Sequence, residues 1–105
     1  MTDAIRIRAR VKDGLTDARV LLVHPMESGL RRDAAGQAIA AHYITAVEMC
    51  VGSRLVFSAA FGRSVSRDPL LHVRFRGAQP GDRLRVRWID NLGASLSDET
   101  IIEAA

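Results

Sequence analysis

The sequence predicts an all-β fold, an immunoglobulin-like antiparallel β-sandwich of about seven strands. Two observations support this prediction. Short segments in which apolar and polar residues alternate recur along the chain, and turn-forming residues separate them at intervals of roughly 8 to 12 residues. The length of 105 residues permits one modest hydrophobic core, so residues 1–105 are expected to form a single domain.

The first two strands are expected near the N-terminus, with a tight turn between them. Arginine alternates with isoleucine and alanine over residues 5–10, which is the pattern of a strand that buries one face. Asp13-Gly14 predicts a turn, and residues 18–23 predict the second strand. Residues 25–38 are rich in charged and turn-forming residues, so a long loop is expected there.

Residues 37–50 fit two structures. Apolar residues at helical spacing and four alanines favour a helix. Residues 43–51, however, alternate with a period of two and lead into Gly52-Ser53, a two-residue turn that precedes residues 55–57. We therefore predict a β-hairpin in this region.

Further strands complete the predicted sandwich. They are expected at residues 70–76, 83–89 and 95–102, with turn-forming residues between them. Trp88, the only tryptophan, is expected to face inward and to pack across the two sheets against Phe57 and Phe75.

The charge pattern disfavours some classes of function. The chain has 15 Lys and Arg residues against 12 Asp and Glu, a net charge of +3. Arginines form alternating rows on the expected strands: Arg6, Arg8, Arg10, Arg74, Arg76, Arg83, Arg85 and Arg87. A solvated sheet face is the favoured interpretation, and the lack of interleaved aromatic residues disfavours nucleic-acid binding. The chain has no long apolar run and no signal-peptide pattern, so we expect no membrane partner and no export signal of its own.

The residues that suit metal binding or thiol chemistry are scattered along the sequence. The imidazole and sulfur groups belong to His24, Met26, His42, Met49, Cys50 and His72. They are predicted to be core or loop residues, and no metal site or other cofactor is expected. Cys50 has no histidine near it in sequence to act as a base, so no catalytic residue is predicted. It is either a small residue on the outer side of a strand or a thiol that faces a partner chain.

The long loop carries the most specific signal. It begins His24-Pro25-Met26-Glu27-Ser28-Gly29-Leu30-Arg31-Arg32-Asp33, and these segments follow in order: Gly36, His42-Tyr43-Ile44, Phe57-Ser58-Ala59, Ser66-Arg67-Asp68-Pro69-Leu70 and Trp88-Ile89-Asp90-Asn91-Leu92-Gly93. In these segments the chain resembles the SoxZ family, whose members form one half of the SoxYZ carrier of bacterial thiosulfate oxidation. It departs from the family pattern at Ala40, where Pro is usual, and at Asp68, where Asn is usual.

The resemblance implies a non-catalytic β-sandwich subunit that pairs with SoxY as a heterodimer or a higher oligomer. SoxY carries sulfur intermediates on the cysteine of a flexible arm, which meets SoxAX, SoxB and SoxCD transiently. The resemblance also implies a periplasmic location, reached by export together with SoxY. Recognition often lies on a long loop of a rigid sandwich, so the expected partner-binding residues are His24, Pro25, Met26, Glu27, Gly29 and Arg31.

Two functions of other classes stay open at this point. One is a small copper-binding periplasmic β-sandwich protein that uses His24, Met26 and His42 as ligands. The other is an enzyme that uses Cys50 as its nucleophile, for which the sequence offers no base.

Overall fold

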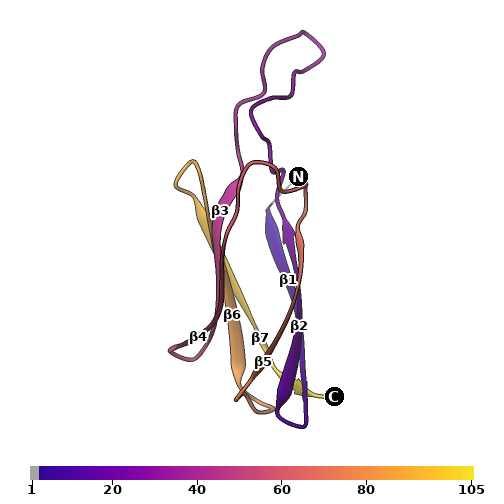
Figure 1. The fold of residues 1–105 in the computed structure, drawn as a ribbon, viewed down its shortest axis with the longest axis vertical. Helices are drawn as coiled ribbons and strands as arrows, with labels where there is room; N and C mark the ends of the chain where they lie inside the picture. Colours follow the sequence, from indigo (N-terminus) through magenta and orange to yellow (C-terminus); the bar gives the residue numbers. More distant parts are fainter. Residues whose placement is uncertain (1–2) are drawn as a thin grey trace.

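The computed structural model describes residues 3–105 and contains, within that range, eight β-strands and no helix (Figure 1). The strands are β1 (Ala4–Lys12), β2 (Leu15–Val23), β3 (Ile44–Val51), β4 (Arg54–Ala60), β5 (Leu70–Arg76), β6 (Arg83–Asp90), β7 (Ser95–Ile101) and β8 (Glu103–Ala104). They form two four-stranded sheets with the orders β5-β2-β1-β8 and β4-β3-β6-β7. The predicted antiparallel β-sandwich is confirmed, with the short β8 added as a parallel neighbour of β1. Nothing in the described range forms a helix that could cross a membrane.

β1 and β2 form a hairpin whose tight turn explains where β2 begins. Asp13 and Gly14 have positive φ angles of 52° and 77°, the conformation of a two-residue turn whose twist matches the flanking strands. Pairing therefore starts at once, with Lys12 opposite Leu15. As a result β2 begins at Leu15 and not at residue 18, where the sequence pattern placed it.

Of residues 37–50, which fitted both a helix and a strand, residues 44–50 lie in β3 and form the predicted hairpin with β4, whereas residues 37–43 belong to the preceding loop. The predicted alternation is wrong at its start, because Ile44 is fully buried and Thr45 only half-buried. The register with β6 shifts between Ile44 and Ala46. Such a bulge adds a residue to one strand and changes the direction of the side chains beside it. After the bulge the strand follows the predicted alternation again, and Val47 points inward as predicted.

The hydrophobic core lies between the two sheets. Fully buried side chains come from both: Val20 and Leu22 on β2, Val47 and Met49 on β3, and Leu84 and Val86 on β6. Trp88 points inward and is 2% exposed, as predicted, but its aromatic partner in the described residues is His24 and not Phe57 or Phe75. The strand register explains this, since Trp88 lies near the end of β6 whereas Phe75 pairs with Thr16 near the other end of the sandwich.

The two long sides of the sandwich differ. On one side β1 and β7 contact each other and close the gap between the sheets. On the other side the edge strands are β4 and β5, which make no comparable contact with each other in the described part of the chain. We call the side formed by β4 and β5 the open side, and in Figure 1 it faces the reader.

Residues 24–43 project from one end of the sandwich as a long loop (Figure 1). The isolated bridges Glu27–His42 and Arg32–Ala38 hold its two arms together. The projection makes the molecule elongated, with principal extents of 54, 22 and 20 Å. The loop predicted at residues 25–38 is thus confirmed, and it continues to the start of β3.

Candidate functional site

A buried carboxylate fixes the base of the loop to the end of the sandwich. Asp90, the last residue of β6, is 3% exposed. Its Oδ1 accepts hydrogen bonds from the backbone N–H groups of Leu92 and Ala94, both at 3.0 Å. His42 donates from Nε2 to its Oδ2 at 2.9 Å. One carboxylate therefore joins the β6–β7 turn to the returning arm of the loop.

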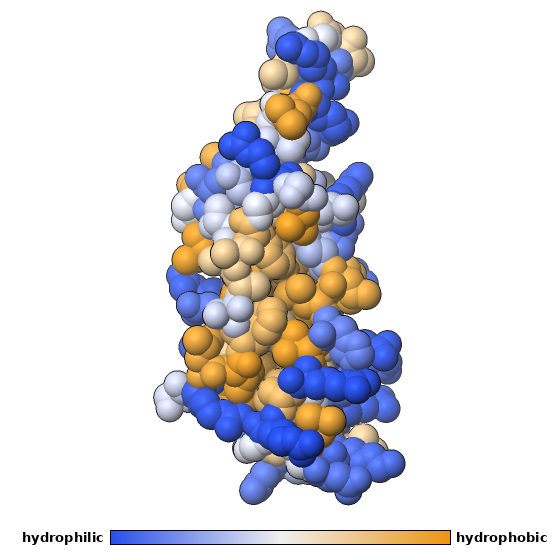
Figure 2. Space-filling model, viewed as in Figure 1, coloured by the Kyte–Doolittle hydropathy of each residue, from blue (hydrophilic) through white to orange (hydrophobic). Residues whose placement is uncertain are grey.

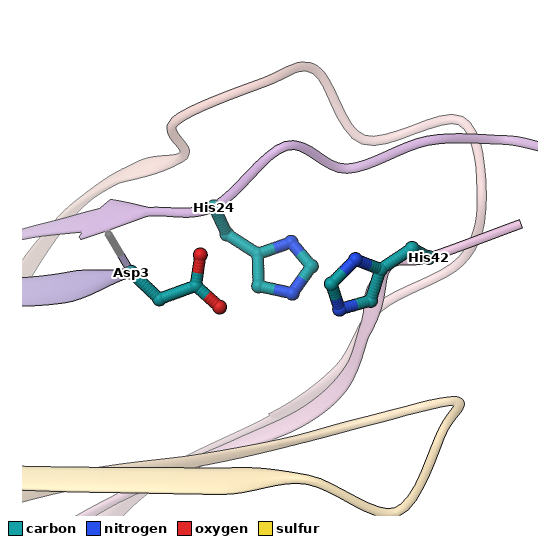
Figure 3. A group of neighbouring side chains, drawn as sticks. All are labelled: Asp3, His24 and His42. Atoms are coloured by element: carbon teal, nitrogen blue, oxygen red, sulfur yellow. The ribbon is translucent and has the colours of Figure 1, made fainter. Parts of the chain in front are cut away.

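His24 lies beside His42, where β2 ends (Figure 3). Its side chain is fully buried, and its ring centroid lies 5.0 Å from Trp88 and 4.6 Å from His42 in edge-on contacts. The N–H of Met26 donates to His24 Nδ1 at 3.1 Å. The proton of the neutral ring is therefore on Nε2, which lies 3.6 Å from Asp90 Oδ2. His24 braces the first residues of the loop against the core.

Two segments distant in the sequence complete the anchoring. The Asp68 side chain accepts the backbone N–H of His24 at 3.0 Å, and the Asp68 N–H donates to the His24 carbonyl at 3.1 Å. The Asn91 side chain accepts the N–H of Tyr43 at 2.8 Å. Asp68 and Met26 both adopt positive φ angles, 52° and 47°, a strained conformation that persists where surrounding contacts hold it.

Burial and hydrogen bonding set the protonation states of this cluster. Burial opposes ionisation of Asp90, but hydrogen bonds from His42 and from two backbone N–H groups outweigh it and lower the pKa of the carboxyl group. Burial lowers the pKa of the His24 imidazole and outweighs the nearby carboxylates of Asp3 and Asp90. At neutral pH the cluster therefore contains an ionised Asp90 and a neutral His24.

These shifts couple stability to pH, with the same sign for both groups. Unfolded His24 binds a proton as the pH falls below about 6.5, whereas folded His24 binds it only at lower pH. Its stabilising contribution is present above about pH 6.5 and is lost as the pH falls through the folded pKa. The contribution of Asp90 is present above its unfolded pKa of about 3.9 and is lost as the pH falls through its own, lower folded pKa.

We expect the free energy of unfolding, measured with urea at pH 7 and pH 5, to fall less for His24→Asn than for the wild type. Asparagine can still accept the Met26 N–H, but it does not titrate. An equal fall in the wild type and in His24→Asn would contradict the assignment of a buried, neutral His24.

Asp3, His24 and His42 each offer a possible metal ligand, and these atoms lie within 4.8 Å of one another (Figure 3). His24 and His42 are far apart in the sequence, but they come together because β2 and the returning arm of the loop meet at one place; His24 is buried in the core and His42 lies in the loop. The hydrogen bonds nevertheless do not favour a metal centre. A metal-bound histidine normally donates from its other ring nitrogen, whereas His24 Nδ1 accepts the Met26 N–H. The Met26 sulfur, the third ligand of the copper alternative, already accepts the Ile44 N–H at 3.3 Å.

The expected partner-binding residues follow the first arm of the loop, and most of them shape it. His24 and Met26 are buried, Pro25, Glu27 and Gly29 are half-buried, and Arg31 is exposed. Arg31 donates to the Glu27 carboxylate at 2.6 and 3.2 Å, and this hydrogen bond lowers the pKa of Glu27. Gly29 has a φ of +88°, and a Cβ at this position would lie 3.1 Å from the Ala41 Cβ on the other arm. Glycine is therefore what lets the two arms approach.

A concavity of about 360 Å³ lies beside the base of the loop. It is lined by Pro25, Met26, Glu27, Ser28 and Arg31, which belong to the loop, and by Arg67 from the β4–β5 connection. The structure thus brings most of the expected partner-binding residues together. It adds Arg67, which sequence reasoning missed as a candidate.

The open side exposes apolar side chains of both edge strands. Phe57 on β4 and Leu71 and Val73 on β5 pack against the core, yet they are only half-buried. Leu55 on β4 and Leu70 on β5 are 53% and 67% exposed, but the strand registers place them on the outer faces of the two sheets, Leu55 opposite Cys50 and Leu70 opposite Leu21. Figure 2 shows a continuous apolar tract along the middle of this face. Each edge strand pairs with one neighbour in the described residues, and an exposed strand edge with apolar surface beside it is typical of a protein–protein interface.

A family model, described as the sulphur oxidation protein SoxZ, matches residues 5–100. The chain belongs to the SoxZ family. No curated protein sequence matches this SoxZ-family chain. The fold is similar to that of superoxide reductases (neelaredoxins) in two solved structures, one from Archaeoglobus fulgidus in the reduced form and one from Ignicoccus hospitalis. The first has a TM-score of 0.62 and 16% identity over 96% of this chain and 88% of that one. The second has a TM-score of 0.63 and 20% identity over 96% and 79%. At these identities the likeness shows the fold alone.

In this SoxZ-family chain, segments that carry the resemblance meet in space at the base of the loop. His24, His42, Asp68 and Asp90 all belong to them. Asp68 and Asp90 were not predicted as site residues, because no linear pattern shows that the end of β6 lies against the loop. The one available signal was their place in the shared segments. Asp68 stands where the family usually has Asn, and either side chain can accept the His24 N–H.

Cys50 lies on β3, opposite Leu55 of β4 and Arg85 of β6. It is a half-buried free thiol. Neither cross-strand neighbour can act as a general base, so the structure adds no support to an enzyme that uses this cysteine. A thiol that faces a partner chain stays a prediction.

Proposed function

We propose that this SoxZ-family chain is the non-catalytic subunit of a SoxYZ carrier in bacterial sulfur oxidation. In this proposal it binds and stabilises SoxY and presents the SoxY cysteine arm to the Sox enzymes in the periplasm. The observation that carries the proposal is the open side. A chain that stayed alone would leave the flanks of Phe57, Leu71 and Val73 in water, and burial of such apolar surface is the main favourable term in association.

The size of the open side suits an extended partner. β4 and β5 have seven residues each, so each edge is about 23 Å long at about 3.3 Å per residue. A stable heterodimer buries roughly 1,600 Å² in total, about half of it on each chain. The half-buried side chains of the two edge strands supply an apolar centre for such an interface. The free edge of β4 or β5 can add backbone hydrogen bonds to a strand of SoxY.

The projecting loop supplies a second contact surface in this proposal. Its base is fixed by Asp90 and His24, whereas Leu30 is 81% exposed and Arg31 and Arg32 are also exposed. A rigidly anchored loop presents these side chains in a defined position. We assign this surface to the transient recognition of SoxAX, SoxB or SoxCD, and the open side to the permanent pairing with SoxY.

Co-expression with SoxY tests the proposal. Size-exclusion chromatography with light scattering is expected to show one species that contains both chains in equal amounts, because the open side needs a permanent cover. An unrelated monomeric β-sandwich co-expressed with SoxY serves as the control and should elute separately. Two separate peaks for the chain and SoxY at micromolar concentration would contradict the proposed function.

A further inference from the structure

Most of the charged side chains on the outer face of the sheet β5-β2-β1-β8 are arginines. Residues that alternate with the core positions point outward on three neighbouring strands. They are Arg6, Arg8, Arg10 and Lys12 on β1, Asp17 and Arg19 on β2, and His72, Arg74 and Arg76 on β5. We call this surface the basic face. Hydrophilic side chains beside β2 and β5 are visible at the lower right of Figure 2.

The basic face is hollowed. A concavity of about 770 Å³ is lined by six cations, Arg8, Arg10, Lys12, Arg19, Arg74 and Arg76. Asp13 and Asp17 are the acidic side chains in its lining. The surface is therefore both strongly cationic and concave.

Ion pairing within the chain uses only part of this charge. Asp17 contacts His72 at 2.7 Å, Arg74 at 3.0 Å and Arg19 at 3.8 Å. Among residues 3–105, Arg6, Arg8, Arg10, Lys12 and Arg76 take part in no ion pair. Arg8 lies directly opposite Arg19 in the β1–β2 register. Like charges opposite each other destabilise a sheet, so folding does not account for the pairing of Arg8 with Arg19, whereas Arg10 in the same register lies opposite Asp17.

The arginines of the other sheet are arranged differently. On β6, Arg87 lies opposite Glu48 of β3, and Arg85 lies opposite Glu99 of β7. Arg83 donates to the Glu99 carboxylate at 3.1 Å. On that face Glu48 and Glu99 thus lie opposite arginines, which brings its charge closer to balance. The basic face differs because its neighbouring strands add further cations.

The spacing of the cations indicates the kind of ligand. Outward side chains on one strand are about 6.6 Å apart, so the row from Arg6 to Lys12 spans about 20 Å. This is too long for a single small anion, and it suits a ligand that carries several negative groups. The guanidinium group pairs with carboxylates through two parallel hydrogen bonds. A nucleic acid fits less well, because Asp13 and Asp17 lie within the surface and the only Phe, Tyr or Trp of these strands, Phe75, is buried.

We infer that the basic face is a docking surface for an acidic protein surface, separate from the open side. The arginines pair with carboxylates of the partner, and their combined charge raises the rate at which the two proteins associate. Salt weakens this attraction, because at about 0.1 M salt charges more than about 10 Å apart are largely screened. The inference is independent of pairing with SoxY, since the basic face is the outer side of one sheet and the open side lies between the sheets.

Binding of fluorescently labelled poly-L-glutamate to the full chain tests this inference. Anisotropy titrations at about 50 mM salt are expected to show binding that weakens as salt is added. The double variant Arg8→Gln/Arg10→Gln should weaken binding by about tenfold, because two exposed ion pairs contribute up to about 1 kcal/mol each. The matched control Arg85→Gln/Arg87→Gln removes two arginines at the same spacing from β6 and should change binding less than twofold.

Three results would overturn the inference: no binding of poly-L-glutamate, equal weakening by both double variants, or tighter binding of a duplex DNA of equal charge. Equal weakening would mean that net charge and not this surface governs binding, and tighter DNA binding would assign the face to nucleic acid. Affinity for SoxY, measured in parallel on both double variants, keeps this test distinct from the proposed function. We expect that affinity to stay at the wild-type level.

Discussion

Replacing Trp88 with alanine is expected to lower the free energy of unfolding by about 3–5 kcal/mol. Trp88 is 2% exposed, it packs edge-on against His24, and its strand neighbours are Val47 and Leu96. Truncation would leave a cavity between the core and the buried cluster that anchors the loop, and such a cavity can collapse only if the anchor moves. Urea denaturation monitored by far-ultraviolet circular dichroism measures the change.

The matched control is Trp88→Phe. The indole N–H of Trp88 is buried and has no hydrogen-bond partner in the described residues, so its removal leaves no acceptor unpaired. Phenylalanine keeps a ring beside His24 and should cost less than half as much as alanine. A cost below about 1 kcal/mol for Trp88→Ala would show that this residue does not connect the core to the loop base.

Placing a carboxylate on the open side should abolish most of the affinity for SoxY. Val73→Glu puts a charged group on β5, at a half-buried position that packs against the core. In a formed interface this charge would be buried without a partner, which costs several kcal/mol. We expect at least a 100-fold weaker Kd for SoxY, or about 3 kcal/mol, measured by isothermal titration calorimetry.

The control for this variant is Leu96→Glu on β7. Leu96 is also half-buried and packs against the core, but its strand lies on the side that β1 closes. Both variants lose a similar apolar contact within the fold, so near-ultraviolet circular dichroism should show comparable packing in the two. Equal losses of SoxY affinity in both would place the effect in the fold and remove the open side from the interface.

The fold could be predicted from the sequence because its strands bury one face each. The alternation of arginine with apolar residues over residues 5–10 and 83–89 leaves little choice of structure. Where prediction failed, a local departure from regular pairing was the cause. The shift of register between Ile44 and Ala46 moved Thr45 away from its expected face, and the tight turn at Asp13-Gly14 lengthened β2.

The loop base could be predicted only in part. His24, Met26 and Glu27 stand together in the sequence, so their common place at the start of the loop could be predicted from the loop itself. Asp90 was not, because its contact with His42 joins residues 48 positions apart. The open side was also not readable, since it depends on which strands lie at the edges, and strand order follows from long-range pairing. The same holds for the basic face, where the charge of β1 and β5 adds up only because β2 lies between them.

We propose that the chain binds SoxY through its open side. Hydrogen exchange of the backbone amides, measured by mass spectrometry for the chain alone and for its complex with SoxY, tests this claim most directly. We expect strong protection on complex formation in β4 and β5, and little change in β7 at the closed side. Protection confined to β7 or to the projecting loop, with β4 and β5 unchanged, would contradict the account.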